Sequence, residues 1–148
     1  MKPRLDKQCL ADVNVLLPLL VRHHEHHEIA LRWFDGLHAG EAVICRFVQL
    51  ALIRLLSNRT IMREFVLSAA AAWQLIEELM EDERLAFAAE PALLDSALPA
   101  LLTDPVPTNK LVADAYLAAF AIAATLRLTT LDHGFQQFRG LDLQLLAP

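Results

Sequence analysis

Short apolar runs alternate with longer helical segments along this chain, and that alternation predicts its fold. Runs such as CLADV and RLTTL are apolar without a clean alternation of apolar and polar positions, which is typical of strands covered on both faces of a sheet. The expected strands are 9–13, 42–45, 84–89, 127–131 and, as a possible last strand, 141–146. Strands separated by helices indicate an α/β domain with a mostly parallel sheet and helices on both faces.

Apolar residues at helical spacing fill the intervals between these strands. Asn14 is placed to cap a short helix that Pro18 bends or ends, and Pro91 stands at a first-turn position. Thr108 or Asn109 caps the longest helix, and the segment 46–58 is apolar almost all round, so we expect it to be largely buried. The expected helices are 14–21, 25–37, 46–58, 69–82, 91–102 and 110–126, with a short helical turn over 132–138.

Four polar residues far apart in the sequence are expected at one edge of the sheet, where the carboxyl ends of the strands form the functional crevice of an open α/β fold. Asp12 ends the first strand, Gln49 lies one turn into the helix after the second strand, and Asp132 follows the fourth strand. Asp114 lies in the second turn of the helix that leads into that strand, and a right-handed crossover starts this helix at the same edge.

Three aspartates gathered in one place repel one another unless a cation neutralises them. Asp114 is the sole acidic residue of an apolar helix, where an unpaired carboxylate is costly. An all-oxygen cluster selects Mg²⁺ or Mn²⁺ over zinc. The alternative is structural, because Asp132 could cap a helix and Asp12 could form a turn with Asn14. The convergence of all three aspartates favours a metal site.

The segments LADVNVLLPLL, CRFVQLALIRLLSN, ADAYLAAFA and LTTLDHGF, in this order and spacing, resemble the PIN-domain ribonucleases, specifically the VapC toxins of bacterial toxin–antitoxin pairs. The likeness runs from about Cys9 to Phe135. It implies a single PIN-like domain over 1–148 with three α/β/α layers and a Mg²⁺- or Mn²⁺-dependent endoribonuclease activity. A VapB-type antitoxin and a homodimer are the implied partners. By position, Asp12, Asp114 and Asp132 match the family's metal-binding acids, and Asn14 matches the polar residue that follows the first of them.

One position departs from this pattern, because many members of the family carry a glutamate where this chain has Gln49. An amide offers a carbonyl oxygen without charge, so this difference leaves metal affinity, metal choice and activity open. Direct ligation by Gln49 and a buried amide bonded to backbone are both open. Arg46, on the same helix, is a candidate for binding RNA phosphates, and Lys110 is another basic residue that could border the crevice.

The sequence VRHHEHHEIA holds four histidines and two glutamates in six consecutive positions. Helical spacing puts His23 and His27 on one face and His24 and Glu28 on another, which gives pairs of residues in place of a three- or four-ligand set. The HExxH motif is absent from this segment. We therefore interpret the histidines as structural or surface residues, with a zinc-binding module as a poorer alternative.

Composition and charge narrow the function classes further. The chain has 148 residues with a formal net charge of −5, which argues against binding nucleic acid by overall charge alone. No apolar run is long enough for a membrane span and the first residues lack a signal-peptide pattern, so we expect a cytoplasmic protein. Cys9 and Cys45 fit buried free thiols. The preferred function is a ribonuclease toxin, and the alternative is a catalytically weak PIN-like protein that binds RNA or an antitoxin.

Overall fold

The computed structural model describes residues 7–147 and contains a five-stranded parallel sheet in the order β3-β2-β1-β4-β5. The strand β1 at its centre pairs with β2 on one side and β4 on the other. The strands are β1 (Cys9–Ala11), β2 (Ala42–Cys45), β3 (Leu85–Ala88), β4 (Arg127–Thr130) and β5 (Leu143–Leu145). The predicted α/β class with a short parallel sheet is confirmed, and the possible last strand is present.

Helices fill the intervals between the strands, and four of the α-helices start at other residues than expected. The longest helix begins at Asn109, one residue earlier than predicted, because Thr108 is its N-cap. The first α-helix begins one residue earlier because Asp12, not Asn14, is its N-cap. The helices α2 and α6 begin two and three residues later than predicted, after turns. The α-helices are α1 (Val13–Leu20), α2 (His27–Asp35), α3 (Arg46–Leu56), α4 (Arg59–Met62), α5 (Ala69–Met80), α6 (Leu94–Leu101) and α7 (Asn109–Ala123), with 3₁₀ turns η1 (Arg63–Phe65) and η2 (His133–Gln137).

Pro18 lies inside α1 and does not end it, because the helix continues to Leu20. A proline in this position removes one backbone donor, the one that would bond to the carbonyl of Asn14. The helix compensates by packing, since Val15, Leu16, Leu17 and Pro18 are all buried. Burial of this apolar face therefore outweighs the local cost of the proline.

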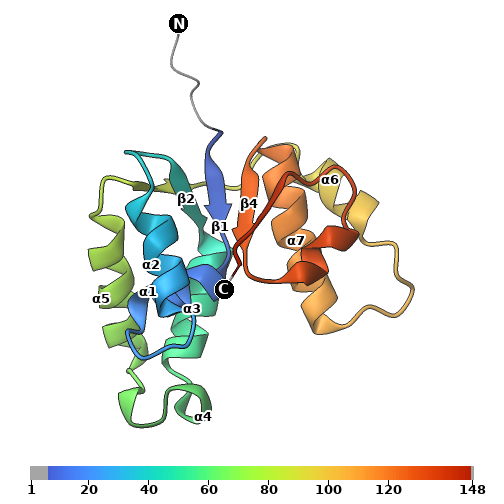
Figure 1. The fold of residues 1–148 in the computed structure, drawn as a ribbon. Helices are drawn as coiled ribbons and strands as arrows, with labels where there is room; N and C mark the ends of the chain where they lie inside the picture. Colours follow the sequence, from blue (N-terminus) through green and yellow to red (C-terminus); the bar gives the residue numbers. More distant parts are fainter. Residues whose placement is uncertain (1–6, 148) are drawn as a thin grey trace, which may run out of the picture.

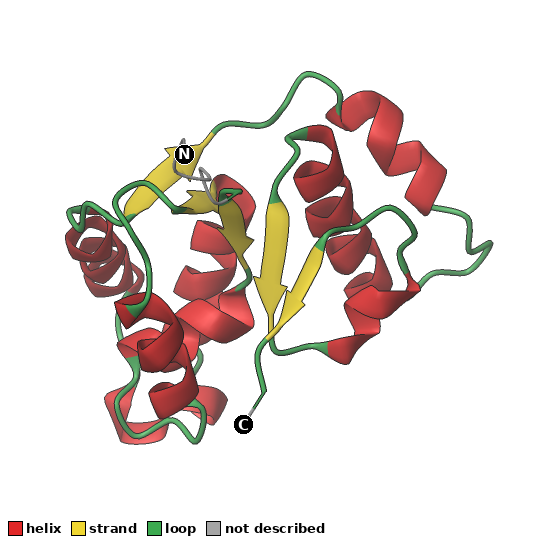
Figure 2. Cartoon of the chain, turned by 45° about the horizontal axis from the view of Figure 1, so that its top comes forward, coloured by secondary structure: helices red, strands yellow, loops and turns green. Residues whose placement is uncertain are grey.

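The order in which the chain places its strands on the two sides of β1 determines which face of the sheet each helix covers. From β1 the chain adds β2 and then β3 on one side, and it then returns across the sheet to place β4 on the other side of β1. Right-handed crossovers put the helices of these two movements on opposite faces. Figures 1 and 2 show this separation, with α1 to α5 forming one group and α6 and α7 the other.

The core lies between the sheet and both groups of helices. Leu10, Ile44 and Leu128 of the strands are fully buried, and Leu16, Leu52 and Phe120 pack on them from the helices. The helix α3 is less buried than its composition predicts, because Leu50 is half exposed. Cys9 and Cys45 are buried free thiols, as predicted. Burial raises the pKa of both thiols.

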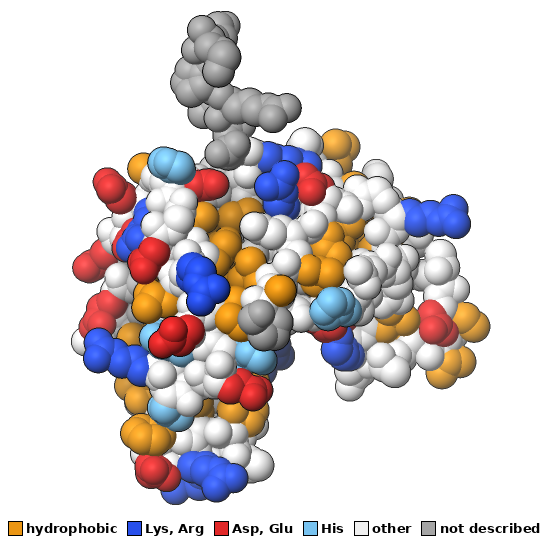
Figure 3. Space-filling view, in the orientation of Figure 1, with side chains coloured by type: hydrophobic (Ala, Val, Ile, Leu, Met, Phe, Trp, Pro, Cys, Tyr) orange, Lys and Arg blue, Asp and Glu red, His pale blue; other side chains and the backbone are white. Residues whose placement is uncertain are grey.

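Charged side chains lie mainly around the margin of the face shown in Figure 3, and apolar side chains gather at its middle. No helix among residues 7–147 is long and apolar enough to cross a membrane.

Candidate functional site

Two of the three predicted aspartates lie beyond the carboxyl ends of neighbouring strands. Asp12 follows β1 directly and Asp132 follows β4 after one residue, and the backbone N–H of Asp12 donates to the carbonyl of Thr129 at 3.0 Å. Asp114 lies on α7, whose first turns are at this same edge because the helix ends where β4 begins. The topology therefore brings the ends of β1 and β4 and the start of α7 together.

Asp12 is the most buried of these carboxylates, with 5% of its surface exposed. One oxygen, Oδ1, accepts from the backbone N–H of Val13 at 2.7 Å, and Oδ2 accepts from the hydroxyl of Thr130 at 2.8 Å. Burial is the largest cause that raises the pKa of Asp12 to about 6; these two hydrogen bonds lower it, and the charges of Asp114 and Asp132 raise it. The folded protein thus holds a carboxylate that is costly to ionise without a cation.

Thr130, which the sequence analysis did not single out, joins Asp12, Asn14 and Asp132 in one network. Its hydroxyl oxygen accepts from the side-chain amide of Asn14 at 3.0 Å and from the backbone N–H of Asp132 at 3.0 Å. The amide oxygen of Asn14 accepts from the backbone N–H of Leu131 at 3.1 Å. Asn14 therefore fixes the end of β4 against the end of β1. The sequence signal for such a network is the pair Thr129 and Thr130 at the end of an apolar strand.

Lys110 lies between the other two aspartates. Its Nζ donates to Asp114 Oδ2 at 2.7 Å and to Asp132 Oδ2 at 2.5 Å. The lysine lowers the pKa of Asp132 and the two carboxylates raise the pKa of Lys110, whereas burial raises the pKa of Asp114 above its usual value. The other oxygen of Asp132, Oδ1, accepts from the backbone N–H of Gly134 at 2.8 Å. The acidic cluster thus already contains one cation, an ammonium group.

The three carboxylates do not form a closed set of ligands in this arrangement. Within residues 7–147, no group of three or more His, Cys, Asp or Glu side chains is close enough to hold a metal ion. Asp114 and Asp132 face Lys110, and Asp12 faces Thr130. The chemistry of the donors still fits a hard divalent cation, since all are carboxylate oxygens and two of them bind a cationic group.

Gln49 and Arg46 bind each other. The guanidinium Nη1 of Arg46 donates to Gln49 Oε1 at 2.7 Å, and Gln49 is buried with 4% of its surface exposed. Because arginine can only donate, the carbonyl end of the amide is the end that faces Arg46. The guanidinium also lies over the rings of Trp73 at 5.5 Å and Phe87 at 5.0 Å. The two interpretations of Gln49, a metal ligand and an amide bonded to backbone, did not include this side-chain partner. Arg46 binds the carbonyl oxygen, which is the atom that would ligate a metal.

The rings of His23 and His27 have different neighbours, whereas the rings of His24 and His26 lie beside each other with centroids 5.6 Å apart. The ring Nδ1 of His27 is 2.7 Å from the carbonyl oxygen of Pro18, and the ring of His23 packs on Phe65 with centroids 4.3 Å apart. His24 Nδ1 accepts from the backbone N–H of His26 at 3.0 Å. Residues 22–26 form turns ahead of α2, so the helical pairing expected for them applies only from His27 onward.

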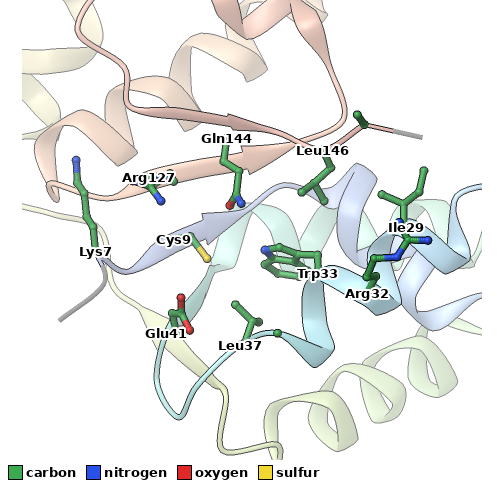
Figure 4. A pocket seen from close by; sticks show the side chains of 12 residues that line it. Lys7, Cys9, Ile29, Arg32, Trp33, Leu37, Glu41, Arg127, Gln144 and Leu146 are labelled. Atoms are coloured by element: carbon green, nitrogen blue, oxygen red, sulfur yellow. The ribbon is translucent and has the colours of Figure 1, made fainter. Parts of the chain in front are cut away.

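A cavity of about 390 Å³ lies away from the carboxylates, between α2 and the strands β1, β4 and β5 (Figure 4). Trp33 and Leu37 line it from the helix, and Cys9 and Arg127 line it at the starts of β1 and β4. None of the predicted site residues is part of its lining. The carboxylate site is therefore separate from this cavity.

Comparison with known proteins places these features in context. The family model described as PIN domain matches residues 9–141. The chain is 37% identical to Ribonuclease VapC41 of Mycobacterium tuberculosis over 143 residues, which cover 93% of this chain and 98% of that protein. It is 33% identical to Ribonuclease VapC29 of the same organism, over 94% of this chain and 96% of that protein.

Solved structures share the fold at low sequence identity. The crystal structure of VapBC2 from Rickettsia felis, bound to a DNA fragment from its promoter, superposes with a TM-score of 0.65 at 16% identity, and the match covers 94% of this chain and 98% of that chain. The toxin VapC20 of Mycobacterium tuberculosis, described as cleaving the sarcin-ricin loop, gives a TM-score of 0.64 at 16% identity over 93% and 99% of the two chains.

Proposed function

This chain belongs to the PIN domain family, and we propose that it is a VapC-type ribonuclease toxin, which cleaves phosphodiester bonds in RNA and is neutralised by a VapB-type antitoxin. The observation that carries the proposal is the convergence of Asp12, Asp114 and Asp132 in a chain that is 37% identical to a VapC ribonuclease over 93% of its length. A fold alone would not carry it, because one fold hosts many functions.

The proposed activity depends on Mg²⁺ or Mn²⁺, with Asp12, Asp114 and Asp132 as the residues that would hold the ion. Such an ion, when bound, activates a water molecule and polarises an oxygen of the scissile phosphate. The chain contributes rigidity: Thr130 and the Val13 N–H orient Asp12, and the Gly134 N–H orients Asp132. Asn14 acts through Thr130 as a positioning residue.

Arg46 is the proposed contact for RNA phosphates. Its side chain is exposed to solvent and held in place by Gln49, Trp73 and Phe87. A planar guanidinium suits phosphate oxygens, and a neighbouring exposed ring gives an unpaired base a surface for stacking. Phe87 is 46% exposed and supplies such a ring. In this proposal Gln49 supports Arg46 and is not a metal ligand.

The antitoxin is proposed to reach the carboxylates with a basic side chain. An arginine presented to Asp114 and Asp132 would replace Lys110 with a stronger, bidentate pairing and block the approach of RNA. The homodimer and the cytoplasmic location stay predictions, and size-exclusion chromatography with light scattering tests the first of them.

Cleavage of purified total RNA, followed with Mn²⁺, with Mg²⁺ and with a chelator, tests the proposed activity. We expect metal-dependent cleavage by the parent and a loss of roughly 100-fold or more in Asp114→Asn, which keeps the size of the side chain but removes a charged ligand. Asp95→Asn is the matched control, since Asp95 is an exposed residue of α6 outside the cluster.

A folded parent that binds RNA or antitoxin but cleaves no RNA with either metal would contradict the proposal. It would favour the second candidate, a catalytically weak PIN-like binding protein. One observation favours that candidate. Arg46 binds the carbonyl of Gln49, and an amide at this position adds no fourth carboxylate to the site.

A further inference from the structure

Lys110 stands at an unusual place for a lysine. It is the second residue of α7, where the positive end of the helix dipole disfavours a cation. Two carboxylates offset that cost, Asp114 one turn further along the helix and Asp132 on another segment 22 residues away. A pair one turn apart on a helix surface is common and weak, but the second partner makes Lys110 a bridge between α7 and the end of β4.

We propose that Lys110 is the built-in counter-ion of this site, and that its ammonium neutralises Asp114 and Asp132 in the metal-free protein and leaves them when the divalent ion binds. The proposal rests on the proposed metal-dependent function. In this proposal Lys110 competes with the metal ion for the carboxylates and so lowers the metal affinity of the site.

The oxygens in use show why the ammonium and a metal ion compete. Lys110 occupies Oδ2 of both Asp114 and Asp132. Asp132 Oδ1 already accepts from the Gly134 N–H, so Oδ2 is the oxygen of Asp132 that Lys110 and a metal ion would share. A divalent ion on these oxygens would stand within contact distance of Nζ, and like charges at that distance repel strongly.

The lysine is also able to leave. Its side chain is 65% exposed, whereas the side chains of Asp114 and Asp132 are 13% and 29% exposed. The mobile partner therefore lies on the solvent side, and the carboxylates that must stay are the more buried groups. An exposed flexible side chain exchanges into water at little cost.

Titration of Mn²⁺ by calorimetry, with melting curves in its presence and absence, tests the exchange without measuring catalysis. Lys110→Met keeps most of the apolar stem and removes the charge, so we expect Mn²⁺ to bind about tenfold more tightly. We also expect the metal-free protein to melt at a lower temperature and to gain more from Mn²⁺ than the parent does.

Lys7→Met is a matched control, because Lys7 also pairs with an aspartate, Asp142 at 3.0 Å, outside the cluster. The same charge is lost from the protein, and Mn²⁺ affinity is expected to stay at the parent value. Lys110→Arg keeps the positive charge and can hold both carboxylates, so its Mn²⁺ affinity is expected to equal or fall below that of the parent.

The outcomes separate this inference from the proposed function. Equal or weaker Mn²⁺ binding in Lys110→Met, or tighter binding in Lys110→Arg, would overturn the exchange while leaving metal binding by the parent intact. A parent that binds no Mn²⁺ and cleaves no RNA would instead overturn the proposed function. If Lys110→Met is unstable, Lys110→Gln removes the same charge with a polar side chain, and the same tighter binding of Mn²⁺ is expected of it.

Discussion

The histidine segment 23–27 and the aspartates Asp12, Asp114 and Asp132 are opposite cases of clustering. The histidines are adjacent in the sequence, yet the rings of His27 and His23 contact different partners, the Pro18 carbonyl and Phe65. The aspartates are up to 120 positions apart in the sequence. Two of them nevertheless share one lysine, and the third accepts a hydrogen bond from Thr130, the last residue of β4. Neighbouring positions along a turn point side chains in different directions, whereas parallel strands bring remote positions to one edge. Chemistry is therefore better sought at strand ends than in dense runs.

The largest difference expected between the two regions is in the pH dependence of folding. The pKa of Asp12 is raised from 3.8 to about 6 in the folded protein. Below pH 4 both states hold the proton, and between pH 4 and 6 the folded state binds more protons than the unfolded state. The free energy of unfolding of the metal-free protein therefore falls as the pH rises through this window, by about 3 kcal/mol from Asp12 alone. Asp12→Asn should remove that fall.

Urea unfolding at pH 4 to 8 measures this contribution as the difference between the parent and Asp12→Asn. Asp142→Asn is an informative control, because Lys7 and Arg127 lower the pKa of Asp142, so its contribution to the pH slope lies below pH 4 and its removal should leave the slope between pH 4 and 8 unchanged. Parallel pH profiles for the parent and Asp12→Asn would contradict the assignment of Asp12 as the costly carboxylate.

A smaller effect is expected from Thr130→Val. The substitution removes the donor to Asp12 and leaves the Asn14 amide and the Asp132 N–H without their acceptor. We expect a loss of about 1–3 kcal/mol in the free energy of unfolding and a further rise in the pKa of Asp12, which moves metal binding to higher pH. Thr129→Val is the matched control, because Thr129 is equally buried and donates to Gln144 instead. Similar Mn²⁺ profiles in the two variants would separate Thr130 from the site.

For the histidines we expect an effect on stability alone. His27→Ala removes the contact with the Pro18 carbonyl, which joins α1 to α2, so the free energy of unfolding should fall by about 1 kcal/mol. Mn²⁺ affinity, RNA cleavage and the response to zinc should match those of His38→Ala, a change at an exposed histidine outside the segment. A zinc-dependent stabilisation that disappears in His27→Ala would restore the histidines as a metal site.

The smallest effect is expected from Gln49→Glu. A new carboxylate at this position would pair with Arg46, which already donates to the side chain, so Mn²⁺ affinity should change by less than about threefold. Combining it with Arg46→Met frees the carboxylate, and the double variant should bind Mn²⁺ more tightly than Arg46→Met alone. A gain of about tenfold in the single variant would show that Gln49 faces the metal.

The strands were predictable to within one or two residues because buried parallel strands are short apolar runs with polar ends, as in CLAD and LTTLD. The positions of Asp12, Asp114 and Asp132 followed from strand order and crossover handedness. The helix starts at His27 and Leu94 were less predictable, since turns ahead of a helix share its apolar spacing. Pairing of Lys110 with Asp132 and of Arg46 with Gln49 depends on where side chains reach in space, which periodicity does not encode.

The central position of β1 has a consequence for how the protein comes into being. Asp12 meets Thr130, which lies 118 positions later in the chain, so a ribosome adds all of the segments up to β4 before the partner of Asp12 is made. The strands β1 to β3 and their helices lie earlier in the chain, but contacts between remote segments form late and slowly. A nascent chain that stops before β4 lacks Asp132 as well as Thr130. In this topology the carboxylate edge is completed only after β4 has been made.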